Sequence, residues 1–96
     1  MLRITEQTAA EGSNAVLRLE GRVAGLWVDE LRREFSVRHR RGGPPVLFDL
    51  EKVSFIDNAG IEFFDEVAPD VRVVSCSLFA AEQLKGVLQR QQTVRR

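Results

Sequence analysis

The segment Asp57-Asn58-Ala59-Gly60 is where the sequence first offers chemistry. Asp and Asn side chains accept hydrogen bonds from backbone N–H groups, and the first turn of a helix has such groups without partners. The two small residues that follow would let another molecule approach the backbone closely. The segment therefore predicts a helix start, which is either capped only by its own side chains or also serves as a docking or anion site.

Nucleophilic and metal-binding side chains are sparse elsewhere in the chain. There is one cysteine, Cys76, and one histidine, His39. A single Cys cannot form an internal disulfide, and one Cys with one His cannot supply a typical zinc site. The sequence also lacks a set of base and nucleophile and a Gly-rich phosphate loop. We therefore expect no enzyme activity, no catalytic residue, no bound metal and no cofactor.

The densest charge cluster is Arg38-His39-Arg40-Arg41. Such a cluster could contact an anionic lipid or a nucleic acid, but the C-terminus of a helix favours cations without any partner. The formal net charge of the chain is +0, whereas dedicated nucleic-acid binders carry a basic excess. We interpret the cluster as a helix end and expect no nucleic-acid partner.

Composition indicates one folded domain. The chain has 96 residues, of which 44% are hydrophobic and 29% charged, and this length suits a single core. We expect one domain over residues 1–96, with the core at about 2–90 and a frayed C-terminal tail. No stretch approaches the roughly 20 apolar residues of a membrane span. The N-terminus also lacks the layout of a secretory signal, so we expect a cytoplasmic protein.

A short strand should precede the Asp57–Gly60 turn. Residues 46–50, Val-Leu-Phe-Asp-Leu, follow Pro44-Pro45 and are mostly apolar, which is typical of an interior strand that is buried on both faces. We expect a brief connector with Val53, Phe55 and Ile56 between this strand and the turn.

Alternating patterns predict two further strands before it. Residues 1–7 and 15–20 alternate apolar and polar side chains, which indicates an antiparallel pair whose first strand lies at the sheet edge. Residues 8–14 should form the turn between them, and Gly21 should end the second strand. Residues 26–40 then show the three-to-four spacing of an amphipathic helix.

The second half of the chain predicts a helix, a strand and another helix. The helix should begin near Ala59 and end at Pro69, because proline disfavours a helical residue before it. Residues 71–76 are expected to form the last strand, with Ser77 as the N-cap of a final helix. The predicted fold is therefore α/β, with a four-stranded mixed sheet flanked by about three helices.

Three parts of this pattern together resemble the STAS domain, a family that includes bacterial anti-sigma-factor antagonists. They are Gly21-Arg22-Val23 followed by a helix, the strand at residues 46–50, and Phe55-Ile56-Asp57-Asn58-Ala59-Gly60-Ile61 with its D-x-x-G-[LI] turn. The resemblance covers residues 2–90.

The resemblance implies a regulatory module in signalling and transcription regulation that binds a protein partner. The implied partner is an anti-sigma factor with a kinase-like fold, and the implied contact residues are Asp57, Asn58, Ala59, Gly60 and Glu62. An alternative is a STAS subunit bound to an ABC-type transport ATPase at the membrane surface.

The residue after the turn Asp departs from the pattern of phosphorylated family members. In those members it is Ser or Thr and receives the phosphate, whereas here it is Asn58, which has no hydroxyl to esterify. We therefore expect no phosphorylation switch at this position. The alternative hydroxyls Ser54, Ser75 and Ser77 suit a connector, a strand end and a helix cap.

Two neighbouring features have both structural and functional interpretations. Trp27 is expected to pack in the core or at its rim, although Trp is also enriched among interface anchors. Glu62, Asp65 and Glu66 are expected to form a solvated acidic face of the helix that follows the turn.

Overall fold

A computed structural model describes residues 2–8, 15–39 and 43–88. The described chain forms one mixed sheet of four strands that lie side by side in the order of the sequence: β1 (Leu2–Thr8), β2 (Ala15–Val23), β3 (Val46–Ile56) and β4 (Val71–Cys76). β1 pairs antiparallel with β2, whereas β2 with β3 and β3 with β4 are parallel pairs. The predicted edge strand, antiparallel pairing of the first two strands and interior strand are confirmed.

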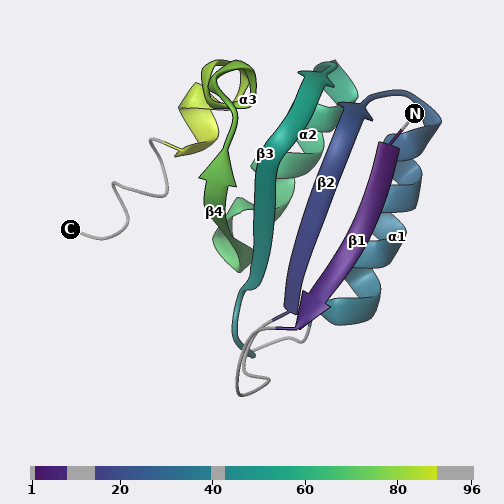
Figure 1. The fold of residues 1–96 in the computed structure, drawn as a ribbon. Helices are drawn as coiled ribbons and strands as arrows, with labels where there is room; N and C mark the ends of the chain where they lie inside the picture. Colours follow the sequence, from purple (N-terminus) through teal and green to yellow (C-terminus); the bar gives the residue numbers. More distant parts are fainter. Residues whose placement is uncertain (1, 9–14, 40–42, 89–96) are drawn as a thin grey trace.

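Helices follow the strands β2, β3 and β4 within the described residues. They are α1 (Leu26–Arg38), α2 (Asn58–Val67), the 3-10 helix η2 (Ala68–Asp70) and α3 (Leu78–Gln83). Figure 1 shows α1 and α2 together behind the sheet, while α3 lies beside the ends of β3 and β4 and packs against β3. The predicted fold class, a four-stranded mixed sheet flanked by helices, is confirmed.

The central strand β3 is longer and less enclosed than predicted. It runs for eleven residues to Ile56, so the connector that the sequence indicated at residues 51–55 is part of the strand. Its burial alternates, with Val46, Phe48 and Leu50 buried and the residues between them half-buried. The prediction of a strand buried on both faces was therefore wrong, because helices α1 and α2 cover only one face of the sheet.

Gly21 does not end the second strand, contrary to the prediction. β2 continues to Val23, and Gly21 has a φ of 105°, a conformation that other residues rarely adopt. The pairing register between β2 and β3 shifts directly after it. Gly21 therefore marks a bulge within the strand, as an isolated strand Gly often does.

Two helices end earlier than predicted. α1 ends at Arg38 with His39 in extended geometry, so it does not reach residue 40. α2 ends at Val67, and Pro69 lies in the 3-10 helix that follows, which agrees with the expected effect of proline. α3 stops at Gln83, and a second helical stretch occupies residues 85–88. The turn was predicted at residues 8–14, but Thr8 belongs to β1, and the rest of that turn lies outside the described residues, as does the predicted frayed tail at residues 89–96.

The core lies between the sheet and the helices α1 and α2. Phe48 of β3 and Phe63 and Phe64 of α2 are fully buried, and their ring centroids lie 5.3, 5.4 and 6.4 Å apart in edge-to-face geometry. Such aromatic pairs contribute roughly 0.5–1.5 kcal/mol each beyond the area they bury. This cluster fixes α2, and with it the turn at residues 57–60, against the centre of the sheet.

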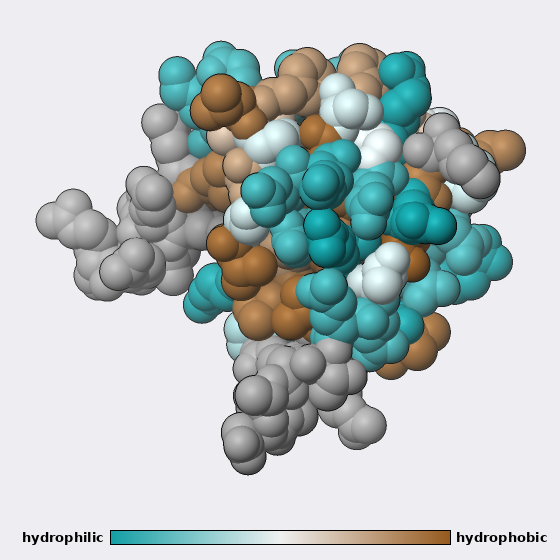
Figure 2. All heavy atoms as spheres, viewed as in Figure 1, coloured by the Kyte–Doolittle hydropathy of each residue, from teal (hydrophilic) through white to brown (hydrophobic). Residues whose placement is uncertain are grey.

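The opposite face of the sheet carries mainly polar side chains. Arg18 and Glu20 of β2 and Asp49 of β3 are half-buried there, and Arg18 Nε lies 3.8 Å from Glu20 Oε2. Figure 2 shows this face, with hydrophilic residues gathered over its middle and hydrophobic ones toward its margins. The mixed charges are typical of a solvated sheet face.

Candidate functional site

The parallel strands bring three helix starts to one edge of the sheet. β2, β3 and β4 point in the same direction, and α1, α2 and α3 follow their C-terminal ends (Figure 1). In α/β sheets this edge is where binding sites are usually built. The Asp57–Gly60 turn lies in the middle of it, between the starts of α1 and α3.

Asp57 binds the starts of two helices at once. Its Oδ1 accepts a hydrogen bond from the Gly60 N–H at 2.8 Å, which makes Asp57 the N-cap of α2, and its Oδ2 accepts one from the Gly25 N–H at 2.9 Å at the start of α1. The Asp57 N–H donates in turn to the Val23 carbonyl at 3.1 Å. The carboxylate therefore fixes the geometry of the edge.

The same two hydrogen bonds favour the ionised form of Asp57. The N–H of Gly25, followed by that of Gly60, stabilises the ionised carboxylate and lowers its pKa below the usual value. Asp57 is thus an anion at neutral pH whose oxygens already have protein partners. Its role in any docking is to hold the turn in place.

Gly60 is buried and allows the close approach of α2 to β2. A Cβ atom added there would lie 2.8 Å from the Val23 carbonyl oxygen and 2.8 Å from Ile56 Cγ2. Because Val23 O is a backbone atom, it cannot move aside cheaply. Gly60 therefore allows the turn to pack closely against Val23 and Ile56, and it does not form part of the exposed surface of the turn.

Asn58 and Ala59 form the exposed part of the turn. Both residues are exposed, and Asn58 makes no side-chain hydrogen bond or ion pair with the described residues. Asp57 is the N-cap of α2, so Asn58 occupies the first helical position, and its side-chain amide does not cap the helix. The turn thus presents a small, uncharged surface at the positive end of a helix dipole.

The three acidic residues of α2 divide between two sides. Glu66 forms an ion pair with Arg32 of α1 at 2.9 Å, whereas Glu62 and Asp65 line a groove toward α3. The single solvated acidic face predicted for these residues is therefore replaced by one side that joins α1 and one that borders α3. Glu62 lies one turn from Asn58 and is exposed.

Large apolar side chains are exposed on both sides of the turn. Leu26 is 84% and Trp27 40% exposed at the start of α1, and Leu78 is 92% and Phe79 39% exposed at the start of α3. Of these, only Trp27 was considered in the sequence as a contact residue. The others could have been identified by noting that residues that follow parallel strands must meet at one edge.

An aromatic and cationic contact borders this edge on the polar sheet face. Phe55 of β3 stacks on Phe79 with a centroid distance of 6.1 Å, and the guanidinium carbon of Arg22 lies 4.4 Å from the Phe55 ring centroid. The second distance is within cation–π range. These contacts orient the start of α3 relative to β3.

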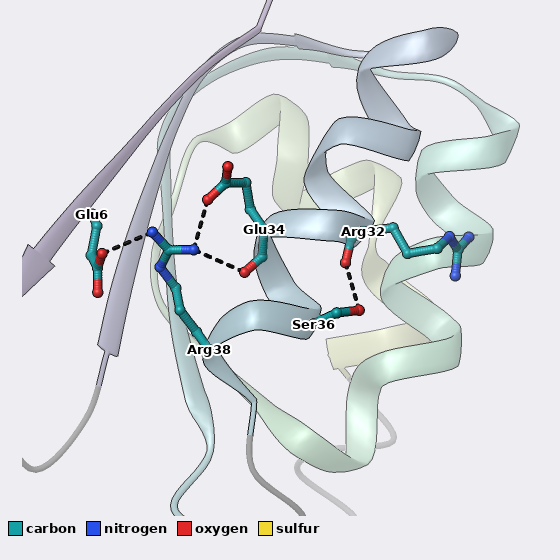
Figure 3. A network of polar contacts seen from close by, with 5 residues as sticks. All are labelled: Glu6, Arg32, Glu34, Ser36 and Arg38. Atoms are coloured by element: carbon teal, nitrogen blue, oxygen red, sulfur yellow. Dashed lines mark hydrogen bonds and ion pairs between the residues drawn. The ribbon is translucent and has the colours of Figure 1, made fainter.

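In the basic cluster at the end of α1, the described residues Arg38 and His39 contact other residues of the same chain. Arg38 donates to Glu34 Oε1 at 2.6 Å and to Glu6 Oε1 of β1 at 2.8 Å (Figure 3). The hydrogen bond to Glu6 is the main reason that the pKa of Arg38 is raised. His39 stacks on Phe35 and lies 3.4 Å from Asp70. Arg40 and Arg41 lie outside the described residues.

The structure does not bring Cys76 and His39 together. His39 contacts Asp70, which precedes β4, whereas Cys76 ends that strand, roughly 20 Å farther along it. Burial raises the pKa of the Cys76 thiol, which disfavours the reactive thiolate.

In the described parts of the chain no group of three or more His, Cys, Asp or Glu side chains could hold a metal ion. None of the described helices combines the length and apolar character needed to cross a membrane.

Comparison with known proteins identifies the fold. No protein-family model and no curated protein matches the chain. A crystal structure of an anti-sigma factor antagonist from Mycobacterium paratuberculosis is 13% identical, with a TM-score of 0.74 over 97% of this chain and 82% of that one.

Two other solved structures are also similar. An antisigma-factor antagonist STAS domain from Rhodobacter sphaeroides is 16% identical, with a TM-score of 0.55 over 77% of this chain and 86% of that one. The anti-sigma factor antagonist SpoIIAA in its unphosphorylated form is 18% identical, with a TM-score of 0.52 over 90% of this chain and 66% of that one. The chain therefore has the STAS-domain fold that the sequence resemblance implied.

Proposed function

We propose that this chain is a non-enzymatic regulatory module of the anti-sigma-factor-antagonist type, which acts by binding a protein partner in the cytoplasm. The partner contacts are Asn58, Ala59 and Glu62 at the start of α2, with Asp57 and Gly60 holding them in position. The exposed, uncharged part of the turn, Asn58 and Ala59, lies between two exposed apolar flanks, and this is the single observation that carries the proposal.

The chemistry of this edge suits a protein surface better than a small charged ligand. Asp57 is an anion within the turn, and its charge opposes the binding of phosphate or another anion at the helix start. The flanking Trp27 and Phe79 belong to the residue types that are enriched at protein interfaces. A partner that buries the turn would also cover part of these side chains.

Asn58 gives the proposal its second element, the absence of a phosphorylation switch at this position. Phosphate on a Ser would add roughly −1.5 to −2 charges at the helix start, and an amide cannot accept it. The similar SpoIIAA structure is described as the unphosphorylated form. A module with Asn58 would stay permanently in the neutral state, so its binding would be regulated by its amount or by its partner.

Affinity purification from native lysate followed by mass spectrometry identifies the class of partner. We expect a kinase-like anti-sigma factor to be retained by the wild-type chain. Retention of a transport ATPase instead would support the alternative of a STAS subunit in an ABC-type transporter. Both results would be consistent with a docking module, and only the first supports a role in transcription.

The variant Asn58→Glu tests whether the turn is the contact surface. It places an acidic side chain at the first helical position, where the helix dipole stabilises it by about 0.3–1 kcal/mol, so the fold should be kept. Binding should weaken by several kcal/mol, because an unpaired charge would be desolvated at the interface. Thermal unfolding and partner affinity by calorimetry would measure the two effects.

Ser36→Glu is the matched control for this experiment. Ser36 is exposed near the end of α1, so the substitution introduces the same side chain far from the turn. We expect partner affinity close to that of the wild type. If Asn58→Glu is folded and binds as tightly as Ser36→Glu, the turn is only a helix cap.

A further inference from the structure

The outer side of α1 carries a stripe of residues that face away from the core. Four residues at intervals of four, three and four positions form this α1 stripe: Leu26, Glu30, Arg33 and Val37. An α-helix turns by about 100° per residue, so the four residues lie within a sector of about 60°. The buried residues of α1, Val28, Leu31 and Phe35, point roughly the opposite way. Because α1 lies behind the sheet (Figure 1), the stripe faces away from the strands.

The α1 stripe has apolar ends and a charged middle. Leu26 is 84% and Val37 75% exposed. Between them, Glu30 and Arg33 form an ion pair at 3.3 Å. Single exposed apolar residues are common on protein surfaces, but here two of them lie on the same side of one helix with one charge of each sign between them.

This order of residues is complementary to itself in an antiparallel copy. Leu26 and Val37 lie equally far from the midpoint of the stripe, and so do Glu30 and Arg33. A two-fold axis through the midpoint therefore places Leu26 of one copy beside Val37 of the other, and Glu30 of one beside Arg33 of the other. In a parallel pair each charged residue would face its own counterpart, and the like charges would repel.

We propose that the α1 stripe is a self-association surface, through which two copies of this chain pair their α1 helices antiparallel. The two contacts between Glu30 and Arg33 set the direction and register of the pair. The two contacts between Leu26 and Val37 remove apolar surface from water. This inference goes beyond the proposed function and does not depend on it.

The size of the surface makes the dimer weak. α1 has 13 residues and is therefore about 20 Å long. A pair of helices of this length buries less than the roughly 1,200 Å² that is typical of stable interfaces. The dimer therefore forms at high protein concentration and dissociates on dilution.

Charge reversal tests the pairing of Glu30 with Arg33. Sedimentation equilibrium of the full chain at low salt would be measured up to about 1 mM. We expect Glu30→Arg and Arg33→Glu each to weaken self-association by about tenfold or more, because both charge contacts become repulsive. An equal mixture of the two variants should associate again, since each charge contact then joins a cation of one variant to an anion of the other.

Glu51→Arg is the matched control for the charge variants. Glu51 is exposed on β3, so the variant makes the same substitution as Glu30→Arg on a different surface. It should associate like the wild type. Thermal unfolding of all variants at low concentration would confirm that each one is folded.

Cross-linking tests the antiparallel register. Leu26→Cys and Val37→Cys would each be made in a chain that also carries Cys76→Ala, which removes the only native thiol. Treatment of an equal mixture with a short bismaleimide should join position 26 of one chain to position 37 of the other as the main product, mapped by mass spectrometry. Val74→Cys in the same background is the control, because this position is exposed on β4 and should link only at background level.

Four results would overturn the proposal. The first is a wild-type chain that stays monomeric at the highest concentration. The second is equal self-association of Glu30→Arg and Glu51→Arg, which would place the contact on another surface. The third is a main product that links like positions, which would show a parallel pair. The fourth is a loss of affinity for the captured partner in Glu30→Arg without any self-association of the wild type, which would show that α1 binds that partner instead of a second copy. Loss of self-association in Glu30→Arg with unchanged partner affinity would support the α1 contact and leave docking at the Asp57–Gly60 turn unaffected.

Discussion

Asp57 combines two structural tasks that usually need two residues. One oxygen caps α2, and the other accepts a hydrogen bond from the N–H of Gly25, the residue that precedes α1. Hydrogen bonds to an ionised acceptor are roughly twice as strong as neutral ones. The loss of this carboxylate should therefore loosen the starts of both helices at the proposed docking edge.

Asp57→Ala should lower the free energy of unfolding by about 1–2 kcal/mol at neutral pH, which is the usual range for removal of an N-cap, at its upper part because two N–H groups lose their acceptor. Asp57→Asn is the control, since its amide oxygen can still cap α2 but carries no charge. Chemical denaturation of the three proteins would give the differences. A loss of less than a few tenths of a kcal/mol in Asp57→Ala would contradict the double role.

The pH dependence of this stabilisation has a defined sign. The pKa of Asp57 is lower in the folded chain than its ordinary value, so folding favours the ionised form. The contribution is fully present above the unfolded pKa, about 3.9, and it is lost as the pH falls through the lower folded value. The stability difference between wild type and Asp57→Asn should accordingly be constant from pH 7 to about 5 and shrink below about 4.

The sequence predicted the helix start, but it did not predict which of the two polar residues, Asp57 or Asn58, is the N-cap. Asp and Asn are both good N-caps, and a shift of one residue exchanges their roles, so the pattern alone could not assign the cap to Asp57. The bond to Gly25 joins residues 32 positions apart. Only the parallel packing of β2 and β3 makes that contact possible.

At the scale of elements, strand type and order were predictable, and strand ends were not. Val46 to Leu50 and Val53 to Ile56 are parts of one strand, separated by the exposed Glu51 and Lys52. Two charged residues in a row are typical of a connector, but here the pairing register shifts between Asp49 and Lys52, and this irregularity lets both charged residues be exposed within the strand. The sequence did not reveal this irregularity, because it depends on how β3 pairs with β2.

Arg38 links the end of α1 to the edge strand β1. Its ion pairs should contribute more to the free energy of unfolding than the other, more exposed pairs. Its side chain is 19% exposed and bonds both Glu6 and Glu34. Arg38→Gln should lower the free energy of unfolding by about 1–2 kcal/mol, since hydrogen bonds to charged groups contribute more than exposed ion pairs. Urea unfolding at low and high salt would measure this loss.

Arg33→Gln is the control for the Arg38 prediction. Arg33 pairs with Glu30 at 3.3 Å, but its side chain is 69% exposed, so the pair is largely screened by solvent. We expect a change within about 0.5 kcal/mol. If both variants lose the same stability, the link between α1 and β1 adds nothing beyond an ordinary surface pair.

At the scale of the whole molecule, topology decides which residues can act together. Residues 26–27, 57–60 and 78–79 are far apart in the chain, yet they begin the three helices that follow parallel strands at one edge. From the sequence, the turn could be placed between a strand and the helix that follows it, but its neighbours at this edge were not predicted. The groove between α2 and residues 83–87 depends on how α3 packs beside β3, which no local pattern encodes.

This arrangement leads to a prediction about phosphate transfer. If the partner is a kinase-like protein, its catalytic site would meet the exposed part of the turn, where Asn58 and Ala59 offer no hydroxyl. Incubation of the purified chain with the captured partner and ATP should therefore leave residues 57–60 unmodified and partner affinity unchanged. Peptide mapping by mass spectrometry and calorimetry before and after incubation would test both statements.

Asn58→Ser supplies the control that makes a negative result informative. Ser has a hydroxyl, is small, and at the first position of α2 leaves the Asp57 cap in place. If the partner is an active kinase for this position, the variant should acquire phosphate and release the partner, because about −1.5 to −2 charges would then be desolvated at the interface. Phosphate on Ser54 of the wild-type chain together with partner release would show that the switch operates from another hydroxyl. That result would reject the idea of a module whose binding is independent of phosphorylation.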